Sequence, residues 1–533
     1  MGSLSTLRRA GMVRPIPPKP GLIGLGLSLR KRTMNMATAV ALHRVVRPRH
    51  EALVDDAGRL TWAELDERVN RLANVIRGHV EQAGVEEDPA EPPRVAFMLR
   101  NGREAVELYC AAGRAGAAAV PVNVWSGAGE VAHVVGVQDP VLLVADREVA
   151  DVVEEGAGDV PRLWVGEAPP GEPSYEEALA AASDRQPDVP GTARVITHTS
   201  GTTGKPKGAE RDVGGSGLKV LVRFLEKVPL HRTDRFLLAP PLFHSLAQGM
   251  MGIGLVLGTT LVLPRRFDPE GLLDLIEREE VTAATLVPVM LRRLLEVDEH
   301  PGDERLRIAV LSGEPLPTAL REDAEKRFGR IFHDLYGATE VGWATIATPE
   351  DQVRRPGTVG RPGEDMRIII VGDDGEPLPA GEEGRIYVVT GFEFDGYTGL
   401  GTGDRDELAG AVEFGDVGWL DEDGYLFVSG RSDDMIVSGG ENIYPSEIEG
   451  VLDGHPDVIE VAVVGEADAD YGQALHAFVV RREGSGLDEE AVRAHVRDHL
   501  ARYKAPRRVS FLDELPRNAT GKVLRRELAA PDA

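Results

Sequence analysis

The sequence lacks the cysteines that a disulfide-stabilised fold would need. Its 533 residues include one cysteine, Cys110, which excludes an intrachain disulfide and predicts a cytoplasmic protein. Cys110 falls in an apolar, helix-like stretch, residues 104–115, where a packed core thiol is favoured over a nucleophile. Aromatic residues make up only 5% of the chain and hydrophobic residues 42%, a composition typical of a soluble globular protein.

Acidic residues are absent from the first 50 positions, which carry ten lysines and arginines. The whole chain nevertheless has a net charge of −27, which argues against a nucleic-acid-binding protein. The basic residues are not followed by the long apolar core of a signal peptide. We interpret residues 1–35 as a basic arm with two open positions: on the acidic body of the protein, or as a peripheral contact on an anionic membrane.

A convincing membrane-spanning run is also lacking. Residues 245–263 are uncharged, but they include four glycines, a glutamine, a serine and two threonines, which makes them weak as a transmembrane helix. We predict a buried helix to about Gly258 and then a strand to Leu263.

The chain does contain an alternation of short β-rich runs with helical patterns. The helical patterns include residues 60–78 and 320–328, and the β-rich runs include 94–99, 118–122, 284–287, 307–311 and 331–335. This alternation predicts an α/β fold with largely parallel sheets. The length exceeds one ordinary core, so at least two domains are expected. Polar residues 154–191 are interpreted as a separator between parts of this pattern.

The most specific feature is residues 197–208, which read Thr-His-Thr-Ser-Gly-Thr-Thr-Gly-Lys-Pro-Lys-Gly. Glycines let backbone N–H groups approach a polyanion, hydroxyls add donors and lysine supplies positive charge, so the loop is typical of a phosphate cradle. It is not a Walker A loop, which requires glycine at Thr199 and serine or threonine at Pro206. The segment closely resembles the phosphate-binding motif of the adenylate-forming enzymes, which include acyl-CoA synthetases, peptide-synthetase adenylation domains and luciferases.

This resemblance implies that ATP phosphates are bound by the residues of the loop, namely Thr199, Ser200, Gly201, Thr202, Thr203, Gly204 and Lys205. Two further stretches resemble motifs of the family. Residues 312–317 resemble the turn that borders adenine, which would place Gly313, Glu314 and Pro315 there. Residues 334–340 resemble the motif Asp-Leu-Tyr-Gly-Ala-Thr-Glu, whose candidate site residues here are Asp334, Tyr336, Gly337, Thr339 and Glu340.

The resemblance gives this second motif specific roles. Tyr336 would stack on adenine, Thr339 would contact the α-phosphate and Glu340 would hold Mg²⁺, a hard ion that is bound through few carboxylates plus substrate phosphates. A surface Thr-Glu helix cap is the alternative interpretation of Thr339 and Glu340.

The motifs continue toward the C-terminus. Asp416, fifteen residues before Arg431, matches the family's aspartate that accepts both ribose hydroxyls. Phe414 stands where relatives usually carry threonine, so the packing near the ribose departs from the family pattern. Asp433 matches the residue about which the C-terminal domain turns. A glycine that lets the pantetheine arm of CoA pass matches Gly440. Lys522, in a Thr-Gly-Lys context, matches the catalytic lysine that bridges the carboxylate and the α-phosphate.

His244 is the candidate residue on the acid-binding side of the site. It follows Pro-Pro-Leu-Phe and resembles the histidine that acyl- and aryl-CoA ligases place near the carboxylate; a satisfied core histidine is the alternative. Peptide-synthetase domains place an aspartate near this stretch, and residues 239–263 contain none. The Gly/Met-rich run after His244 would leave room for a long or bulky apolar acid.

The chain is therefore identified as a member of the adenylate-forming superfamily, most like bacterial fatty-acid or acyl-CoA ligases. The resemblance implies a large domain of stacked α/β sheets with a small β-barrel-like part (residues 36–430), a hinge (431–434) and a small mobile α+β domain (435–533). It also implies an ATP- and Mg²⁺-dependent acid–CoA ligase. Three alternatives stay open: an enzyme that stops at the adenylate, a ligase that loads a carrier protein, and a non-catalytic nucleotide-binding protein. The sequence specifies neither the acid nor the oligomeric state.

Overall fold

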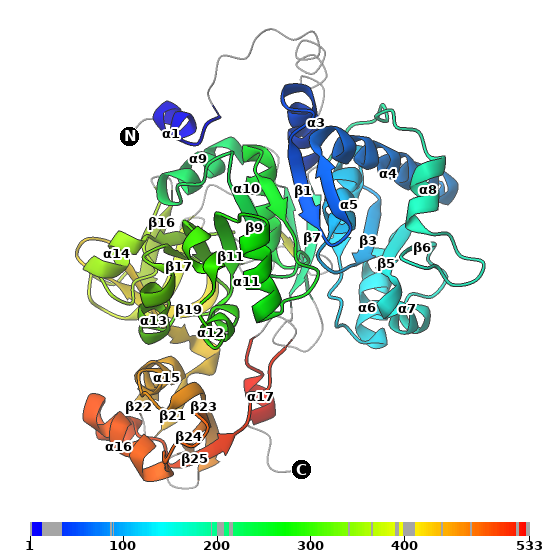
Figure 1. Ribbon diagram of the computed structural model, residues 1–533. Helices are drawn as coiled ribbons and strands as arrows, with labels where there is room; N and C mark the ends of the chain where they lie inside the picture. Colours follow the sequence, from blue (N-terminus) through cyan, green and yellow to red (C-terminus); the bar gives the residue numbers. More distant parts are fainter. Residues whose placement is uncertain are drawn as a thin grey trace.

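The computed structural model of the chain describes residues 3–12, 35–85, 88, 90–192, 194–199, 207–212, 217–338, 342–363, 366–389, 394–397, 411–438, 441–468, 472–518 and 522–528. Figure 1 shows a large part made of two α/β lobes side by side, with a small C-terminal unit beneath them. The α/β class predicted from the sequence is confirmed.

The first lobe is built on a seven-stranded sheet in the order β18-β8-β7-β4-β3-β5-β6. The pairs from β7 to β6 are parallel, whereas β8 runs antiparallel to both β7 and β18. The strands are β3 (Arg94–Met98), β4 (Ala118–Pro121), β5 (Leu142–Asp146), β6 (Arg162–Val165), β7 (Arg194–Thr199), β8 (Lys207–Asp212) and β18 (Phe394–Tyr397). The helices of this lobe are α4 (Trp62–Ala83), α5 (Arg103–Ala115), α6 (Ala128–Gln138), α7 (Ala150–Gly156) and α8 (Tyr175–Ala181).

The second lobe contains a nine-stranded sheet in the order β15-β14-β13-β12-β11-β9-β10-β1-β2. Its central pairs, from β13 to β1, are parallel, so the carboxyl ends of these strands meet at one edge, the usual place for a ligand site in an α/β sheet. The strands are β1 (Glu51–Asp55), β2 (Gly58–Thr61), β9 (Arg235–Leu238), β10 (Thr260–Val262), β11 (Ala283–Leu286), β12 (Ile308–Leu311), β13 (Phe332–Tyr336), β14 (Thr345–Ala347) and β15 (Arg361–Pro362). Its helices include α9 (Gly217–Lys227), α10 (Ser245–Leu257), α11 (Pro269–Arg278), α12 (Pro288–Leu295), α13 (Thr318–Phe328) and α14 (Pro349–Arg354).

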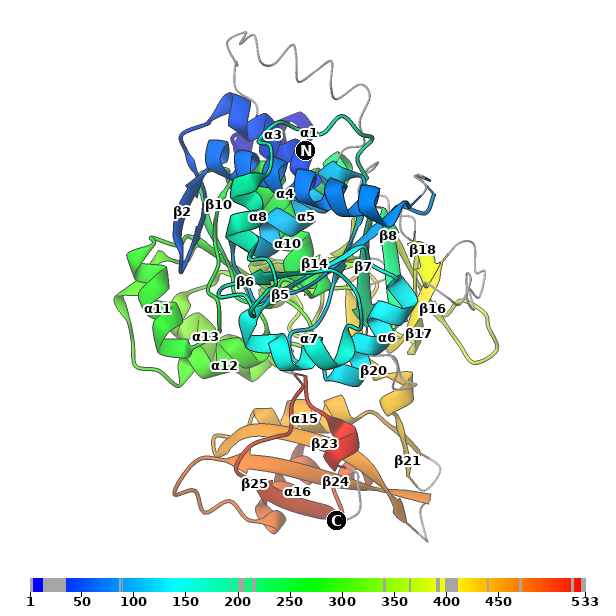
Figure 2. The same cartoon turned by 90° about the vertical axis from the view of Figure 1, so that its right-hand side faces the viewer.

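A four-stranded antiparallel sheet completes the large part of the molecule, in the order β16 (Arg367–Val371), β17 (Gly384–Val389), β19 (Val412–Leu420) and β20 (Leu426–Arg431). The small unit has its own sheet, made of β21 (Ile436–Ser438), β22 (Glu441–Ile443), β23 (Val458–Asp468), β24 (Gly472–Arg481) and β25 (Arg508–Leu512). Its helices are α15 (Pro445–Asp453), α16 (Glu489–His499) and α17 (Arg525–Leu528), which Figure 2 shows around that sheet.

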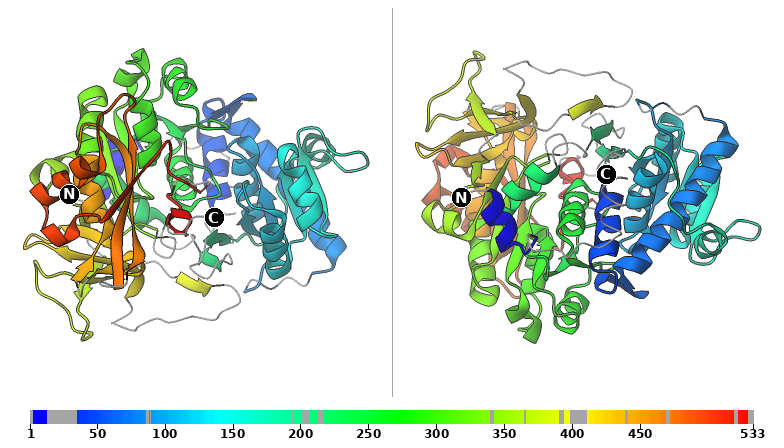
Figure 3. Two further views of the ribbon diagram at one scale, coloured as in Figure 1. Left: turned by 90° about the horizontal axis from the view of Figure 1, so that it is seen from below. Right: turned by 90° about the horizontal axis from the view of Figure 1, so that it is seen from above.

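The small unit lies mainly over the second lobe (Figure 3). Arg292 makes two of the contacts between the small unit and this lobe. Arg292 of α12 forms an ion pair with Asp453 of α15 (3.3 Å) and donates to the carbonyl of Ile459. Burial raises the pKa of Asp453 to about 6 despite the nearby Arg292 charge.

Sequence signals set the ends of the helices that frame the site. Thr61 and Glu64 form a capping box at the start of α4, as expected from the threonine before the apolar pattern. Gly258 ends α10 with a φ of 80°, a left-handed conformation that glycine adopts without penalty. The predicted helix-then-strand interpretation of residues 245–263 is therefore confirmed by α10 and β10.

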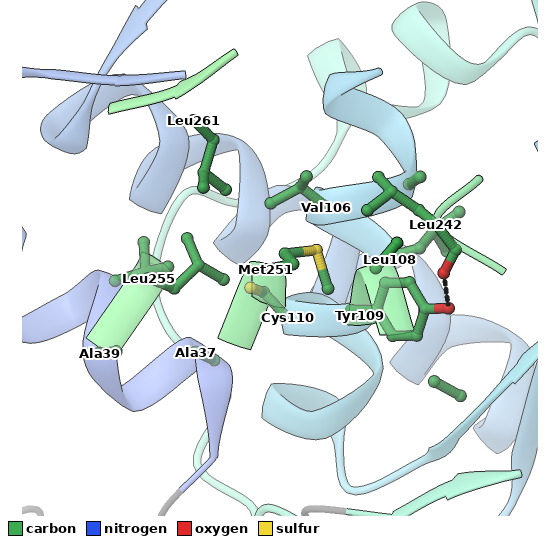
Figure 4. Packing of buried hydrophobic residues seen from close by; sticks show 14 of the residues in the cluster. Ala37, Ala39, Val106, Leu108, Tyr109, Cys110, Leu242, Met251, Leu255 and Leu261 are labelled. Atoms are coloured by element: carbon green, nitrogen blue, oxygen red, sulfur yellow. Dashed lines mark hydrogen bonds between the residues drawn. The ribbon is translucent and has the colours of Figure 1, made fainter. Parts of the chain in front are cut away.

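The core of the molecule joins both lobes. Cys110 of α5 is fully buried beside Val106, Met251 and Ala37 (Figure 4), as predicted for a packed thiol. Burial raises the pKa of this thiol to about 12, so it is protonated near neutral pH. Tyr109, on the same helix, donates a 2.7 Å hydrogen bond to the carbonyl of Leu242. This bond ties α5 to the chain just before α10.

The described part of the basic arm is a short helix, α1 (Ser3–Arg9), that packs against α9 (Figure 1). Thr6 and Ala10 are buried, and the carbonyl of Ala10 accepts from the backbone N–H of Arg232 at 3.1 Å. Of the two positions left open for the arm, this part takes the one on the body of the protein. Residues 13–34 lie outside the described residues.

One expectation is corrected. Residues 154–191 are not a mere separator, because they contain strand β6 and helix α8. Trp164 and Tyr175 on these elements are fully buried, and apolar burial of this kind outweighs the polar composition of the surrounding residues. Among the described helices, none is both long and apolar enough to cross a membrane.

Candidate active site

The phosphate-loop motif follows the end of β7, the antiparallel partner of β8. Thr199 is the last residue of β7 and pairs with Lys207. Residues 194–196, an apolar run that precedes the loop in the sequence, lie in strand β7. The candidate phosphate-binding residues Ser200, Gly201, Thr202, Thr203, Gly204 and Lys205 lie outside the described residues.

A second motif begins just after β12. Gly313 has a φ of 98°, which favours glycine and turns the chain sharply at the carboxyl end of the strand. Glu314 follows, with its carboxylate 3.8 Å from the guanidinium of Arg517. Burial raises the pKa of Glu314, against the opposing charges of Arg517 and Lys522. Pro315 completes this turn, which therefore lies close to the C-terminal segment.

The third motif lies on β13 and in the turn that follows it. Asp334 is buried, and burial raises its pKa to about 7. Gly337 is pressed against the returning chain, because a Cβ atom there would lie 2.6 Å from the Cα of Trp343. Thr339 and Glu340 lie outside the described residues.

Tyr336 and Asp416 connect this motif to the antiparallel sheet. The Tyr336 hydroxyl donates a 2.7 Å hydrogen bond to Asp416 Oδ2, and Arg431 lies 3.5 Å from Asp416 Oδ1. Burial raises the pKa of Asp416, while the Tyr336 hydrogen bond and the charges of Arg431 and Lys522 oppose that rise. Three residues that the sequence predicted for one site, separated by up to 95 positions, thus meet.

Lys522 reaches this site from the small unit. Asn518 and Lys522 lie side by side: the Asn518 side chain accepts from the backbone N–H of Lys522 at 2.9 Å, and the backbone N–H of Asn518 donates to the carbonyl of Lys522 at 2.8 Å. The Lys522 side chain is exposed. Burial raises the pKa of Asp416 and of Glu314, and the charge of Lys522 opposes both rises. A cation on the small unit therefore acts on two carboxyl groups of the large part.

The predicted hinge lies in the short turn Ser432–Asp434 that follows β20. Arg431 pairs with Asp433 at 3.3 Å, and the Ser432 hydroxyl donates to the carbonyl of Gly415 at 3.1 Å. These contacts attach the turn to the strand that carries Asp416. Gly440, the predicted pantetheine-passage glycine, lies outside the described residues.

His244 is the N-cap residue of α10 and packs against Phe243, with the two rings tilted by 49° and their centroids 4.2 Å apart. Burial lowers its pKa to about 4, so the imidazole is neutral near pH 7. Its Nε2 atom is buried and has no hydrogen-bond partner among the described residues. A satisfied core histidine would have one, so this observation favours a ligand-facing role.

The sequence analysis missed an arginine-lined cavity of about 400 Å³ next to Phe243. Its wall includes the exposed ring of Trp125, which contacts Phe243 edge-on at 5.6 Å between centroids. It also contains the guanidinium groups of Arg100, Arg265, Arg266, Arg293 and Arg517. Only the adjacent pair Arg265 and Arg266, shortly after β10, gave a local signal in the sequence; the cluster itself arises from four distant segments.

Two carboxylates behind the cavity orient part of this cluster. Arg100 contacts Glu148 at 2.8 Å, Arg266 also pairs with Glu148, and Arg265 contacts Asp146 at 3.0 Å. Arg517 is also paired, because it contacts Glu314 at 3.8 Å and Glu460 at 3.1 Å. Arg293 has no carboxylate partner among the described residues, so it leaves positive charge in the cavity that attracts an anion.

The comparisons with known proteins agree with this geometry. The chain matches the family model described as AMP-binding enzyme over residues 42–398, and the AMP-binding enzyme C-terminal domain over residues 447–522. It is 36% identical to a feruloyl-CoA synthase from an Amycolatopsis species over 481 residues, which cover 88% of this chain and 93% of that protein.

Two further proteins are informative. The chain is 32% identical over 513 residues to a fatty acid–[acyl-carrier-protein] ligase, ScoC, from Streptomyces coeruleorubidus, with 92% and 95% of the two chains covered. The fold of this chain is similar to that of ATP-bound MatB from Rhodopseudomonas palustris in its crystal structure, with a TM-score of 0.81 and 29% sequence identity. The match covers 93% of this chain and 98% of that chain.

Proposed function

Because this chain belongs to the AMP-binding enzyme family, within the adenylate-forming superfamily, we propose that it is an ATP- and Mg²⁺-dependent acid–CoA ligase. A carboxylate oxygen of the acid attacks the α-phosphorus of ATP, the bond to the β-phosphate breaks, and pyrophosphate leaves. The thiolate of CoA then attacks the acyl carbonyl, and AMP leaves as the thioester forms.

The position of Lys522 is the main observation that supports this proposal. A lysine on a separate small unit would be an ordinary solvated charge, yet Arg517, five positions before it, contacts Glu314 of the large part at 3.8 Å. Burial raises the pKa of Asp416 and of Glu314, and the nearby charge of Lys522 opposes both rises. A fixed cation beside the nucleotide stabilises charge that develops at the α-phosphate. A protein that only binds nucleotide has no need of such a group.

The remaining roles follow the family motifs. Residues 199–205 hold the phosphates, Gly313 to Pro315 and Tyr336 enclose adenine, and Asp416 accepts the ribose hydroxyls. Thr339 contacts the α-phosphate. Glu340 is the residue that would hold Mg²⁺, which neutralises phosphate charge when bound.

The arginine-lined cavity supports CoA as the acyl acceptor. CoA carries a diphosphate and a 3′-phosphate next to an adenine ring, and arginine forks match phosphate oxygens. The exposed ring of Trp125 offers a stacking surface to the base. A carrier protein presents the same pantetheine arm without this nucleotide, so it would bring no adenine ring to Trp125 and no 3′-phosphate to Arg293.

Hydrophobic acids are the proposed substrates. Neutral His244 lies at the start of α10, whose open face at Gly249 leaves room for an apolar body. The feruloyl-CoA synthase shares 36% identity and, by its name, acts on an aromatic acid. We expect medium- to long-chain or bulky acids to react much faster than acetate or amino acids.

Domain alternation is the proposed link between the two steps. Lys522 serves adenylate formation, and Gly440, on the same small unit, serves thioester formation after a turn about Asp433. The Arg292–Asp453 contact would open during that turn.

The test is a panel of carboxylic acids scored by pyrophosphate release, with CoA, dephospho-CoA, pantetheine or a carrier protein as acceptor. We expect CoA to give the highest kcat/KM, and Arg293→Gln to raise the KM for CoA far more than the KM for pantetheine. Equal use of CoA and pantetheine would contradict the assigned nucleotide site. A carrier protein as the best acceptor would favour the activity named for ScoC, and acyl-AMP without any thioester would establish an adenylate-only enzyme.

A further inference from the structure

Three buried polar atoms at the carboxyl edge of the nine-stranded sheet have no hydrogen-bond partner among the described residues. They are the Nε2 atom of His244, the Oγ1 atom of Thr285 and the indole Nε1 atom of Trp343. Buried polar atoms in folded proteins are nearly always paired, so each exception needs an explanation. Three at one edge of one sheet point to a common partner that is not part of the chain.

Trp343 lies in the turn between β13 and β14 and is 6% exposed. Its position is fixed, because the backbone N–H of Ala344 donates to the carbonyl of Tyr336 at 2.8 Å. Gly337 is packed against the Cα atom of Trp343. The indole belongs to the large core cluster that also contains Phe224 of α9 and Met250 of α10. The donor is therefore presented from a rigid support, on the side of the sheet that carries α10.

Thr285 is fully buried on β11. Side chains two positions apart in a strand share one face of the sheet, so Thr285 lies on the same face as Ala283, which belongs to the same core cluster. The backbone carbonyl of Thr285 accepts from Ala239 at 3.3 Å, but its hydroxyl has no such partner. Ala239 follows strand β9 and begins the segment that leads to His244. Thr285 therefore lies next to the segment that carries the residue proposed to lie near the carboxylate of the acid.

Helix α10, which begins directly after His244, has one open face. Met251 and Leu255 pack into the core on one face of the helix (Figure 4). Gly249 lies on the opposite face, 160° from Met251 for an ideal helix of about 3.6 residues per turn, and a Cβ atom there would meet nothing within 4 Å. Gly252, on the same side, has only the end of the Met36 side chain nearby. The open face of α10 and the unpartnered atoms together describe a ligand space with polar points in an apolar wall.

From this arrangement we infer that the substrate acid is not a plain hydrocarbon chain: its apolar body carries an uncharged oxygen away from the carboxylate, and Trp343 is the residue that selects for it. A hydroxyl, ether or ketone oxygen accepts from the indole N–H, and the Thr285 hydroxyl, which can donate or accept, serves as the second polar point. Both groups are uncharged, so they match a neutral oxygen. This inference rests on the proposed function and names the class of acid for the same site.

The experiment compares two pairs of acids that differ by one distal oxygen: 3-phenylpropanoic acid with 3-(4-hydroxyphenyl)propanoic acid, and octanoic acid with 8-hydroxyoctanoic acid. We expect the native protein to prefer the oxygenated acid of at least one pair by about tenfold or more in kcat/KM, because a site built around a polar partner rejects the analogue that lacks it. Trp343→Phe keeps an aromatic ring but removes the N–H, and should bring that ratio close to one.

Thr285→Val, which replaces the hydroxyl by a methyl group, provides a second variant with little change of shape. Trp62→Phe is the matched control, because the Trp62 indole N–H is also buried without a partner in the described structure but lies on α4, outside the site. It should leave the ratio of the native protein unchanged. Binding of each acid is also followed by the shift in melting temperature, which needs no turnover.

The outcomes separate the two proposals. A native preference for the plain acids in both pairs, an unchanged ratio in Trp343→Phe, or a stronger preference for acids with a second carboxylate would overturn the inference while leaving acid activation intact. Absence of pyrophosphate release with every acid, together with oxygen-selective binding that Trp343→Phe abolishes, would overturn the proposed function and leave the assigned site in place.

Discussion

The hydroxyl of Tyr336 donates to the carboxylate of Asp416 across 2.7 Å, and this bond joins strand β13 of the nine-stranded sheet to strand β19 of the antiparallel sheet. The two residues lie 80 positions apart in the chain. The aromatic ring proposed to cover adenine and the carboxylate proposed to hold the ribose are thus placed relative to each other before ATP arrives.

Tyr336→Phe should weaken ATP binding without removing the ring. The variant loses a hydrogen bond to a charged group, worth roughly 1.5–3 kcal/mol, so the KM for ATP should rise about tenfold or more. That hydrogen bond opposes the rise in the pKa of Asp416, so its loss should move the acid limb of the pH profile to higher pH. Tyr425→Phe is the control, since Tyr425 makes a similar 2.8 Å bond to Asp351 outside the site. Equal effects in both variants would assign Tyr336 a structural role only.

Lys522→Ala should block the first step and spare the second. Removal of one preorganised donor to developing charge lowers the rate by roughly 10²–10³, so acyl-AMP formation should fall by that factor. Presynthesised acyl-AMP plus CoA should still yield thioester. Rapid quench measures the two species separately, and Lys326→Ala, at an exposed lysine that pairs with Asp323, is the control. A variant that slowed both steps alike would contradict the division of roles.

Asp433→Pro should hinder the turn of the small unit and leave adenylation intact. Proline fixes φ near −65° and removes a backbone donor, so pyrophosphate should be released at nearly the native rate in a single turnover while little acyl-CoA forms. Asp433→Ala separates this effect from loss of the 3.3 Å ion pair with Arg431. If alanine produced the same block as proline, the ion pair rather than backbone rotation would be responsible.

Glu340→Gln should abolish the Mg²⁺-dependent reaction while keeping the fold. The substitution keeps the size of the side chain but removes the charge that a hard cation prefers. The melting temperature without ligand should match that of the native protein, and pyrophosphate release should be lost at ordinary Mg²⁺ concentrations. Full activity under those conditions would remove Glu340 from the metal site.

Asp334→Asn should make stability depend less on pH. Burial raises the Asp334 pKa from 3.8 to about 7, so between these values the folded state holds a proton that the unfolded state releases. Stability from this group is therefore fully present below about pH 4 and is lost as the pH rises through 7, by at most about 4 kcal/mol. Urea unfolding at pH 5 and pH 8 should show a smaller difference in the variant than in the native protein. Asp423→Asn, at an exposed position, should not change the difference.

Local sequence signals predicted where helices and strands begin and end better than they predicted which of these elements contact one another. Thr61 with Glu64 marked the start of α4, and Gly258 marked the end of α10, because capping depends on neighbouring residues. Contacts such as Tyr336 with Asp416 could be expected only through the family motifs, since no local pattern encodes a partner 80 positions away.

The residues that the sequence did not reveal share this long-range origin. The arginine-lined cavity brings together Arg100, Arg293 and Arg517 from different elements, and each looks like an ordinary surface cation when read alone. Trp343 likewise gave no signal, because the feature that distinguishes it is a missing hydrogen-bond partner, which only the packed structure can show.

The docking of α1 on α9 has a practical consequence for how this protein is handled. α9 carries buried apolar side chains, among them Leu221, Phe224 and Leu225, and α1 covers part of that helix. A chain shortened to begin at Asn35 would bare this surface in water and should be more prone to aggregate on concentration. A purification tag at the N-terminus would extend the segment that packs on α9 of the large part. A tag at the C-terminus would begin eleven residues beyond Lys522, on the small unit that is proposed to move.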